Sequence, residues 1–291
     1  MQAFISQLIC GIELGSIYAV VVIGYNLLVL VTSILHWGYA HLLVLSMYVA
    51  WLVFGVTNNS LALGVSAAIV FGIMASTAIA PLFLPFIRRG AHLEGFVISA
   101  GIASIIVEIQ SHWINYGLAI AFPPALLMGD TTIRFGMSTI SAGRLLTLFV
   151  SIILMLAFFY FLNRSKQGRM LRAVAQDSVV ARILGISVPK MSILSFALSG
   201  LLAGITAICL AVALGTAGPS LGDQLAIKCL SVLILASVGN LKGGLVCAII
   251  LGVLDSMIMG YLPGDWANTS ALLVIVGVLM FKPEGLFGAK N

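Results

Sequence analysis

Long apolar runs constrain this chain more than any other feature of its sequence. The first run covers residues 3–31, and comparable runs recur to the end of the chain. Of the 291 residues, 61% are hydrophobic and only 8% are charged, whereas roughly 25% are charged in a typical soluble domain. Apolar runs of about twenty residues span a bilayer as helices, whereas barrel strands alternate over about ten. The sequence therefore predicts an all-α, polytopic integral membrane bundle.

The polar breaks between the runs predict about eight or nine spans, one or two of them broken or re-entrant. We expect residues 1–291 to form one transmembrane domain. The apolar stretches at 42–56 and 225–238 are short for full spans, and residues 114–128 contain Pro123 and Pro124. We interpret residues 114–128 as a re-entrant or surface segment. The full-length spans are expected at residues 3–31, 61–87, 96–112, 144–162, 191–214, 245–262 and 269–281.

The loop of residues 163–190 carries all of the excess positive charge. It has six basic residues and one acid, Asp177, so its net charge is 6 − 1 = +5, equal to the +5 of the whole chain. Short basic loops stay on the cytoplasmic side of a membrane, so we expect this loop and the C-terminus to be cytoplasmic. A cytoplasmic basic loop accounts for the basic pI of the chain, so we expect no nucleic-acid partner. Residues 170–186 are predicted to form one amphipathic helix ending at Pro189, which either rests on anionic headgroups or docks a partner.

No catalytic or metal-binding spacing is found. The chain has no P-loop, no H-E-x-x-H and no G-x-S-x-G. Its four cysteines lie in apolar stretches without paired spacing. These absences favour a protein that is not an enzyme, and we expect no cofactor and no metal. The first apolar run is too long for a signal peptide and is expected to remain as a span.

Four charged residues fall inside apolar runs: Glu13, Glu108, Lys228 and Asp255. A charge at mid-bilayer costs about 3 kcal/mol on insertion scales, so it faces the bundle interior or a wet cavity. Such residues either line a translocation path or form ion pairs or snorkel near helix ends. Glu13 and Asp255 lie deep in their runs, which favours the path. Glu108 and Lys228 lie near predicted ends, and the two interpretations are balanced.

Residues 172–186, RAVAQDSVVARILGI, resemble the cytoplasmic loop of branched-chain amino acid ABC transporter permeases. In that family an R-A-x-A-x-D-x-x-x-A-x-x-x-G-I pattern forms the coupling helix, which sits in a cleft of the ATPase subunit. Residues 11–20, 196–208 and 282–288 resemble other family stretches in the same order, so the resemblance covers the whole chain. The coupling pattern is matched by Arg172, Ala173, Ala175, Asp177, Ala181, Gly185 and Ile186.

The resemblance also bears on the translocation path. Tyr18 falls in the N-terminal family stretch, and His41 in a segment where the family has N-F-A-H-G. Here that segment is GYAHL, residues 38–42, which loses the asparagine and the final glycine. The resemblance implies that the solute is an amino acid, branched-chain or other, and the departures at residues 38–42 leave urea, an amide or a small carboxylate as the alternative. The candidate path residues are Glu13, Tyr18, His41, Glu108 and Asp255.

The resemblance implies that this chain is the transport subunit of a bacterial inner-membrane importer, with ATP hydrolysis on partner subunits. Its partners would be two cytoplasmic ATPases, a sister permease forming a heterodimer rather than a homodimer, and a periplasmic or lipid-anchored solute-binding protein. An ion-coupled secondary transporter and a membrane-embedded enzyme are the competing interpretations. We expect Gly185→Arg to abolish coupling because only a small residue fits a tight contact between subunits.

Overall fold

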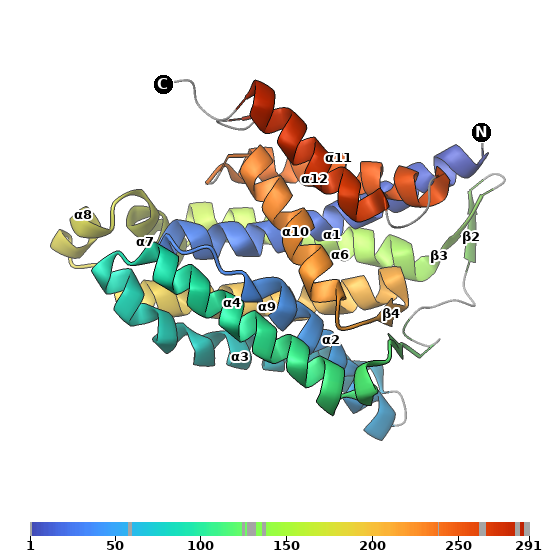
Figure 1. The fold of residues 1–291 in the computed structure, drawn as a ribbon, viewed down its shortest axis with the longest axis horizontal. Coiled ribbons are helices and arrows are strands. Elements are labelled where there is room, and N and C mark those ends of the chain that lie inside the picture. The colour runs from blue at the N-terminus through green and yellow to red at the C-terminus, as the bar shows by residue number, and fades with distance from the viewer. Residues whose placement is uncertain are drawn as a thin grey trace.

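The computed structural model describes residues 2–57, 60–123, 126, 132–135, 138–237, 239–261, 266–282 and 286–287. Over these residues the chain is a bundle of long helices with two small antiparallel sheets (Figure 1). The expected all-α, polytopic bundle is confirmed. Within the described residues, seven helices are long and apolar enough to cross a membrane.

The helices follow one another along nearly the whole described chain. They are α1 (Gln2–Thr32), α2 (Gly38–Val56), α3 (Leu61–Arg89), α4 (His92–Glu108), α6 (Ala142–Arg164), α7 (Lys166–Gln176), α8 (Ser178–Ile183), α9 (Val188–Leu214), α10 (Leu221–Leu235), α11 (Leu241–Tyr261) and α12 (Trp266–Phe281). A π-helical turn, Ile109–Trp113, extends α4 and is followed by a 3₁₀ turn, Asn115–Gly117.

The short apolar stretches of the sequence become helices of different lengths. The stretch at 42–56 is part of α2, which begins at Gly38 and has 19 residues, enough to span a membrane. It is therefore longer than the sequence indicated. The stretch at 225–238, expected to be a span or a half-span, is α10, with 15 residues. The last span, expected at 269–281, is α12, with 16 residues. At about 1.5 Å per residue, both are shorter than a hydrocarbon core of about 30 Å.

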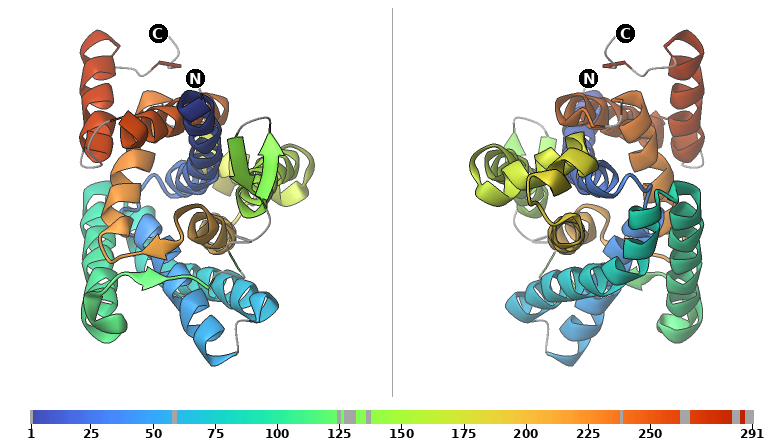
Figure 2. Two further views of the ribbon diagram at one scale, coloured as in Figure 1. Left: turned by 90° about the vertical axis from the view of Figure 1, so that its right-hand side faces the viewer. Right: turned by 90° about the vertical axis from the view of Figure 1, so that its left-hand side faces the viewer.

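Helix α1 lies at the centre of the bundle and packs against α11, α9 and α6 (Figures 1 and 2). Its contact with α11 depends on glycines. A Cβ built on Gly11 would lie 2.6 Å from the Cα of Val253, and one on Gly15 would lie 2.7 Å from the Cα of Ile249. Gly252 of α11 meets the backbone of Gly15 in return. The two helices therefore touch backbone to backbone, as small-residue faces allow in a membrane.

Helices α3 and α9 make a second close contact of the same kind. A Cβ on Gly204 would lie 2.6 Å from the carbonyl oxygen of Ala68, and a Cβ on Gly200 would meet the carbonyl oxygen of Gly72. Ser76 donates a hydrogen bond from its Oγ to the carbonyl of Phe196 at 2.7 Å. The glycine- and serine-rich sequence of α9 is thus used for close helix packing.

The two ends of the bundle differ. At one end, which we call the loop end, α7 packs against α1 and α6, and α8 lies against α7 and α9 (Figure 1). At the other end, strands β2 (Thr132–Phe135) and β3 (Ser138–Ser141) form an antiparallel hairpin, with Phe135 opposite Ser138. Strand β1 (Ile120–Ala121) pairs with β4 (Thr216–Ala217). Part of the segment 114–128 therefore joins the connection between α9 and α10.

The predicted single amphipathic helix over residues 170–186 is wrong. The structure has two helices, α7 and α8, which meet at Asp177. Asp177 has an extended backbone (φ −155°, ψ 108°), and its Oδ1 accepts hydrogen bonds from the amides of Val179 at 2.7 Å and Val180 at 3.0 Å. Aspartate is a strong N-cap and a weak interior helix residue, so the chain restarts a helix there. Pro189 lies in the first turn of α9.

Candidate functional site

Helix α7 is anchored to the bundle by an apolar face. Leu171 and Val174 are buried and pack in one cluster with Phe158 and Leu162 of α6 and with residues near the end of α1. The hydroxyl of Ser165 accepts a hydrogen bond from the amide of Gly168 at 2.8 Å and caps the first turn. The loop is therefore a packed part of the bundle rather than a tether.

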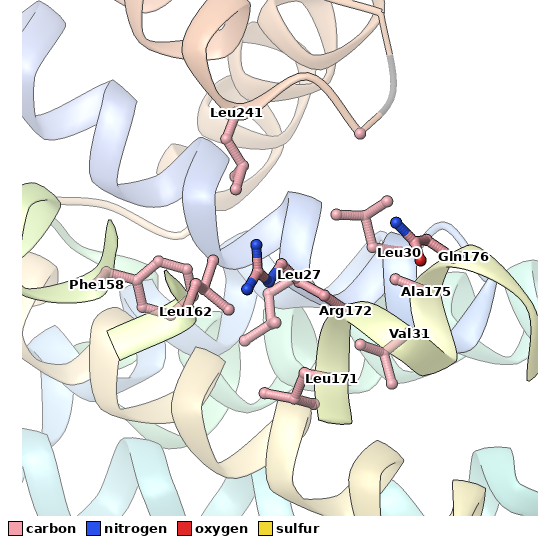
Figure 3. A pocket seen from close by; sticks show the side chains of 11 residues that line it. Leu27, Leu30, Val31, Phe158, Leu162, Leu171, Arg172, Ala175, Gln176 and Leu241 are labelled. Atoms are coloured by element: carbon pink, nitrogen blue, oxygen red, sulfur yellow. The ribbon is translucent and has the colours of Figure 1, made fainter. Parts of the chain in front are cut away.

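Arg172 is exposed, and its side chain also borders a pocket. It lines an apolar pocket of about 200 Å³ at the loop end, where its guanidinium lies beside side chains of α1, α6 and α11 (Figure 3). Its Nη1 donates a hydrogen bond to Oδ1 of Asn163 at 3.1 Å. Arg172 therefore ties α7 to the last turn of α6. Ala173 and Ala175 are partly buried on the same helix.

The remaining residues of the coupling pattern shape α8. Asp177 caps its beginning, and Ala181 is buried. Gly185 has a φ of +84°, and the amide of Ile186 donates to the carbonyl of Ala181 at 2.9 Å. A left-handed residue just past the last turn, with a hydrogen bond reaching back across it, is the usual glycine ending of a helix. The pattern therefore specifies one short helix with a defined start and stop.

This arrangement leaves an apolar surface on α8 that we call the α8 tip: Val179, Val180, Ile183 and Leu184. Their exposed fractions are 62, 49, 79 and 72%. Contiguous exposed apolar side chains at the end of a helix mark contact sites for other molecules. Sequence reasoning placed these residues within one longer amphipathic helix over residues 170–186. Recognising Asp177 as an N-cap would have signalled the break, because the apolar spacing restarts after it.

A buried ion pair joins α10 to α11. Nζ of Lys228 lies 2.7 Å from Oδ2 of Asp255, and the hydroxyl of Tyr18 on α1 donates to the same oxygen at 3.0 Å. The side chains of Lys228 and Asp255 are 5% and 0% exposed. Lys228 lies in the middle of α10, so the expectation that it lies near a helix end is wrong. The sequence left open whether Lys228 and Asp255 line a path or form ion pairs. The structure shows that the two residues form an ion pair with each other.

His41 is held apart from that cluster. Its Nε2 lies 3.0 Å from Oδ1 of Asp223 at the start of α10, with His41 fully buried and Asp223 53% exposed. The ring also packs against Gly222, where a Cβ would lie 2.6 Å from the His41 Cδ2. The pair therefore links a buried side chain of α2 to an accessible carboxylate.

Glu13 lines a third polar region, near the hairpin end of α1. Its Oε1 accepts a hydrogen bond from Thr147 at 2.9 Å, and its Oε2 lies 3.9 Å from Nε of Arg144. Nη1 of Arg144 also donates to the sulfur of Cys10 at 2.8 Å. Glu13, Arg144 and Cys10 line a cavity of about 270 Å³ between α1, α6, α9 and α11. Sequence reasoning missed Arg144, because only the fold brings it beside Glu13.

Glu108 is the remaining sequence-predicted path residue. It lies at the end of α4, 66% exposed, with one carboxylate oxygen 3.0 Å from Nδ1 of His112. The structure therefore brings Tyr18 and Asp255 together, whereas Glu13, His41 and Glu108 each lie in other surroundings. We infer that Glu108 lies outside the path, because its side chain is mostly exposed at the end of α4.

These features define a class of protein: a multi-pass helical membrane protein with a packed basic loop at one end and compensated charges inside. The chain belongs to the family of branched-chain amino acid transport system permease components, whose profile matches residues 8–281.

Individual relatives agree with this assignment. The high-affinity branched-chain amino acid transport system permease protein LivH of Escherichia coli K12 is 23% identical over 98% of this chain and 96% of its own length. BraD of Pseudomonas aeruginosa has the same description, identity and coverage. The autoinducer 2 import system permease protein LsrC of Klebsiella pneumoniae is 31% identical over 44% of this chain and 39% of its own length. No solved structure matches the chain.

Proposed function

We propose that this chain is the transmembrane permease subunit of a binding-protein-dependent ABC importer in the bacterial inner membrane. Its solutes would be branched-chain or other amino acids, in line with the descriptions of LivH and BraD. Urea, amides or small carboxylates are the alternative solutes. Two cytoplasmic ATPases would supply the energy, a sister permease would complete the path, and a solute-binding protein would deliver the solute on the hairpin side.

The observation that carries this proposal is the α8 tip. It presents exposed apolar side chains beyond the ends of the spanning helices, and Leu171 and Val174 fix α7 to the bundle behind it. A displacement of the tip would therefore be transmitted through α7 to α6 and α1. The excess of basic residues in this loop supports placing the loop end in the cytoplasm.

For the path we propose residues on α1 and its neighbours. In the cavity beside Glu13, the carboxylate and the Arg144 guanidinium offer opposite charges, which suits a zwitterionic solute, and Leu14 and Leu214 add apolar surface. Tyr18, Asp255 and His41 would act deeper in the bundle. Because Lys228 compensates Asp255, that pair favours an ATPase-driven permease over an ion-coupled transporter, which needs a carboxylate that is free to bind its ion.

The test is capture of partners from native membranes. Tagged wild-type chain, solubilised in mild detergent, should bring down two P-loop ATPases and a second permease, identified by mass spectrometry. Replacing two tip residues, Ile183→Glu with Leu184→Glu, should reduce the captured ATPase at least about tenfold, because central apolar contacts dominate interface energies. The second permease should still be captured.

Leu118→Glu is the matched control. Leu118 is also an exposed leucine, 66% accessible, but it lies beyond the far end of α4. This variant should capture the ATPases as the wild type does. Capture of the wild-type chain alone, or only with copies of itself, would contradict the importer assignment. An ion-coupled path through Asp255 would then be the next hypothesis.

A further inference from the structure

A basic groove of about 470 Å³ lies beside α8 at the loop end. Arg88 and Arg89 contribute to it from the end of α3, His92 from the start of α4, and Arg182 from α8. It adjoins the apolar pocket that Arg172 lines, with which it shares Val31, Ala175 and Gln176, but Arg172 itself does not line it. Nothing in the proposed transport cycle uses these side chains together.

The charges in the groove are not neutralised by the protein. Within the described part of the chain, the salt bridges include none to Arg88, Arg89 or Arg182. The one acid in the lining is Asp177, and its Oδ1 already accepts two amide hydrogen bonds from α8. Three guanidinium groups therefore face one engaged carboxylate, so the groove favours an anion.

The groove lies at the boundary of the membrane. One candidate span ends at Arg89 and the next begins at His92, so these side chains sit at the level of lipid headgroups. Arg88 also borders an apolar groove of about 290 Å³ with Leu84 and Val188. A further one, of about 400 Å³, runs along Pro81, Leu84 and Pro85 on α3. A basic site thus continues directly into an apolar surface.

We propose that this composite groove binds an anionic phospholipid. The phosphate would lie among Arg88, Arg89 and Arg182, whose planar guanidinium groups match phosphate oxygens. An acyl chain would lie along Pro81 and Leu84. The apolar extension is what favours a lipid over a soluble phosphate, since a soluble ligand gains nothing from it. Basic pockets between transmembrane helices are suited to such headgroups.

The site has a consequence for α8. A phosphate held by both Arg88 and Arg182 would link the end of α3 to α8. It would restrain the position of the α8 tip relative to the spanning helices. Bound lipid would then favour docking at the tip. This consequence rests on the proposed function, whereas lipid binding itself does not.

The experiment measures lipid binding directly and needs no transport partner. Purified, delipidated chain is titrated with phosphatidylglycerol, and bound lipid is counted by native mass spectrometry. The double variant R88Q/R89Q should bind at least about tenfold more weakly, because each basic residue near a membrane surface adds about fivefold to such binding. R182Q should show a smaller loss, and gel filtration reports whether each variant remains folded.

The double variant K166Q/R169Q is the matched control. It removes the same charge from exposed positions on α7 outside the groove, and it should bind as the wild type does. An equal loss in this control would mean diffuse attraction to the whole loop and would overturn the site. Binding of glycerol phosphate as tight as that of phosphatidylglycerol would also overturn it, in favour of a soluble ligand. Phosphatidylcholine should bind weakly, and equal binding of this zwitterionic lipid would remove the requirement for an anion.

Discussion

At the scale of single residues, the Lys228–Asp255 pair decides how this bundle tolerates charge. Each group alone would be costly at its depth, but the 2.7 Å contact and the Tyr18 hydroxyl compensate most of that cost. Both contacts are made by Oδ2 of Asp255. Its Oδ1 is buried and has no hydrogen-bond partner in the described part of the chain. The carboxylate is therefore held firmly from one side only.

A double-mutant cycle tests this pair. Lys228→Met and Asp255→Asn should each lower the unfolding free energy, Lys228→Met by about 3–5 kcal/mol, because it leaves an uncompensated buried charge. The double variant should be markedly more stable than the sum of the two losses predicts. Thermal unfolding of the purified variants in one detergent provides the comparison.

Tyr18→Phe is the control for the cycle. It removes one hydrogen bond and keeps the ion pair, so it should cost only about 1–2 kcal/mol. Strictly additive losses for Lys228→Met and Asp255→Asn would show that the two charges do not stabilise each other.

At the scale of elements, α8 is defined by its two ends. Asp177 begins it and Gly185 ends it, so a six-residue helix is held in one orientation on α7. A Cβ on Gly185 would have no neighbour within 4 Å in this chain, but the φ of +84° disfavours side chains whatever the space. The sequence-based reason for the glycine, a tight contact between subunits, is thus not needed to explain it. Backbone conformation already requires it.

A substitution series at Gly185 separates the two explanations. Gly185→Val should loosen α8, because a left-handed conformation costs a side-chain-bearing residue about 1–2 kcal/mol and a β-branched one more. Gly185→Asn should be milder, since asparagine tolerates this region. Hydrogen exchange of the peptide covering residues 178–186 measures the loosening.

The exchange rates of the two variants, compared with each other, decide between the explanations. If asparagine and valine accelerate exchange equally, backbone conformation is not the reason for the glycine. Gly185→Arg should in either case impair ATPase capture, which tests the docking of the tip and not the shape of the helix.

At the scale of the whole molecule, the central position of α1 depends on glycine contacts. Gly11 and Gly15 allow α11 to approach to backbone distance. This contact aligns Tyr18 with Asp255, and α1 also reaches the pocket at the loop end. A displacement of α1 would therefore affect both the buried charges and the surface against which α7 packs.

Two alanine substitutions in helices make a matched comparison. Gly15→Ala should destabilise the protein by about 1–3 kcal/mol, because its Cβ would overlap the backbone of Ile249. Gly101→Ala on α4 meets no atom within 4 Å and should be neutral or slightly stabilising, as alanine favours helix over glycine. Thermal unfolding of both variants decides the matter, and equal stability of the two would rule out a tight α1–α11 contact.

The sequence by itself determined the class of protein, most of its helices, the basic loop and the family. These properties depend on hydropathy and charge summed over neighbouring residues, and the sum requires no knowledge of the fold. The same local reading located the basic loop between two spanning helices, and the role of the coupling pattern on that loop remains a proposal. It erred at Asp177, where a capping side chain outweighs the apolar periodicity around it, and at α2, whose polar first turn is buried in the bundle.

Only the tertiary structure decided which polar residues meet. Asp255 contacts Tyr18 across 237 positions of sequence, and Thr147 reaches Glu13 across 134. Arg88 and Arg182 share a groove because α3 and α8 end side by side. Such contacts depend on the close approach of helices that glycines permit, and this approach is set by packing over the whole bundle and not by any local stretch of chain.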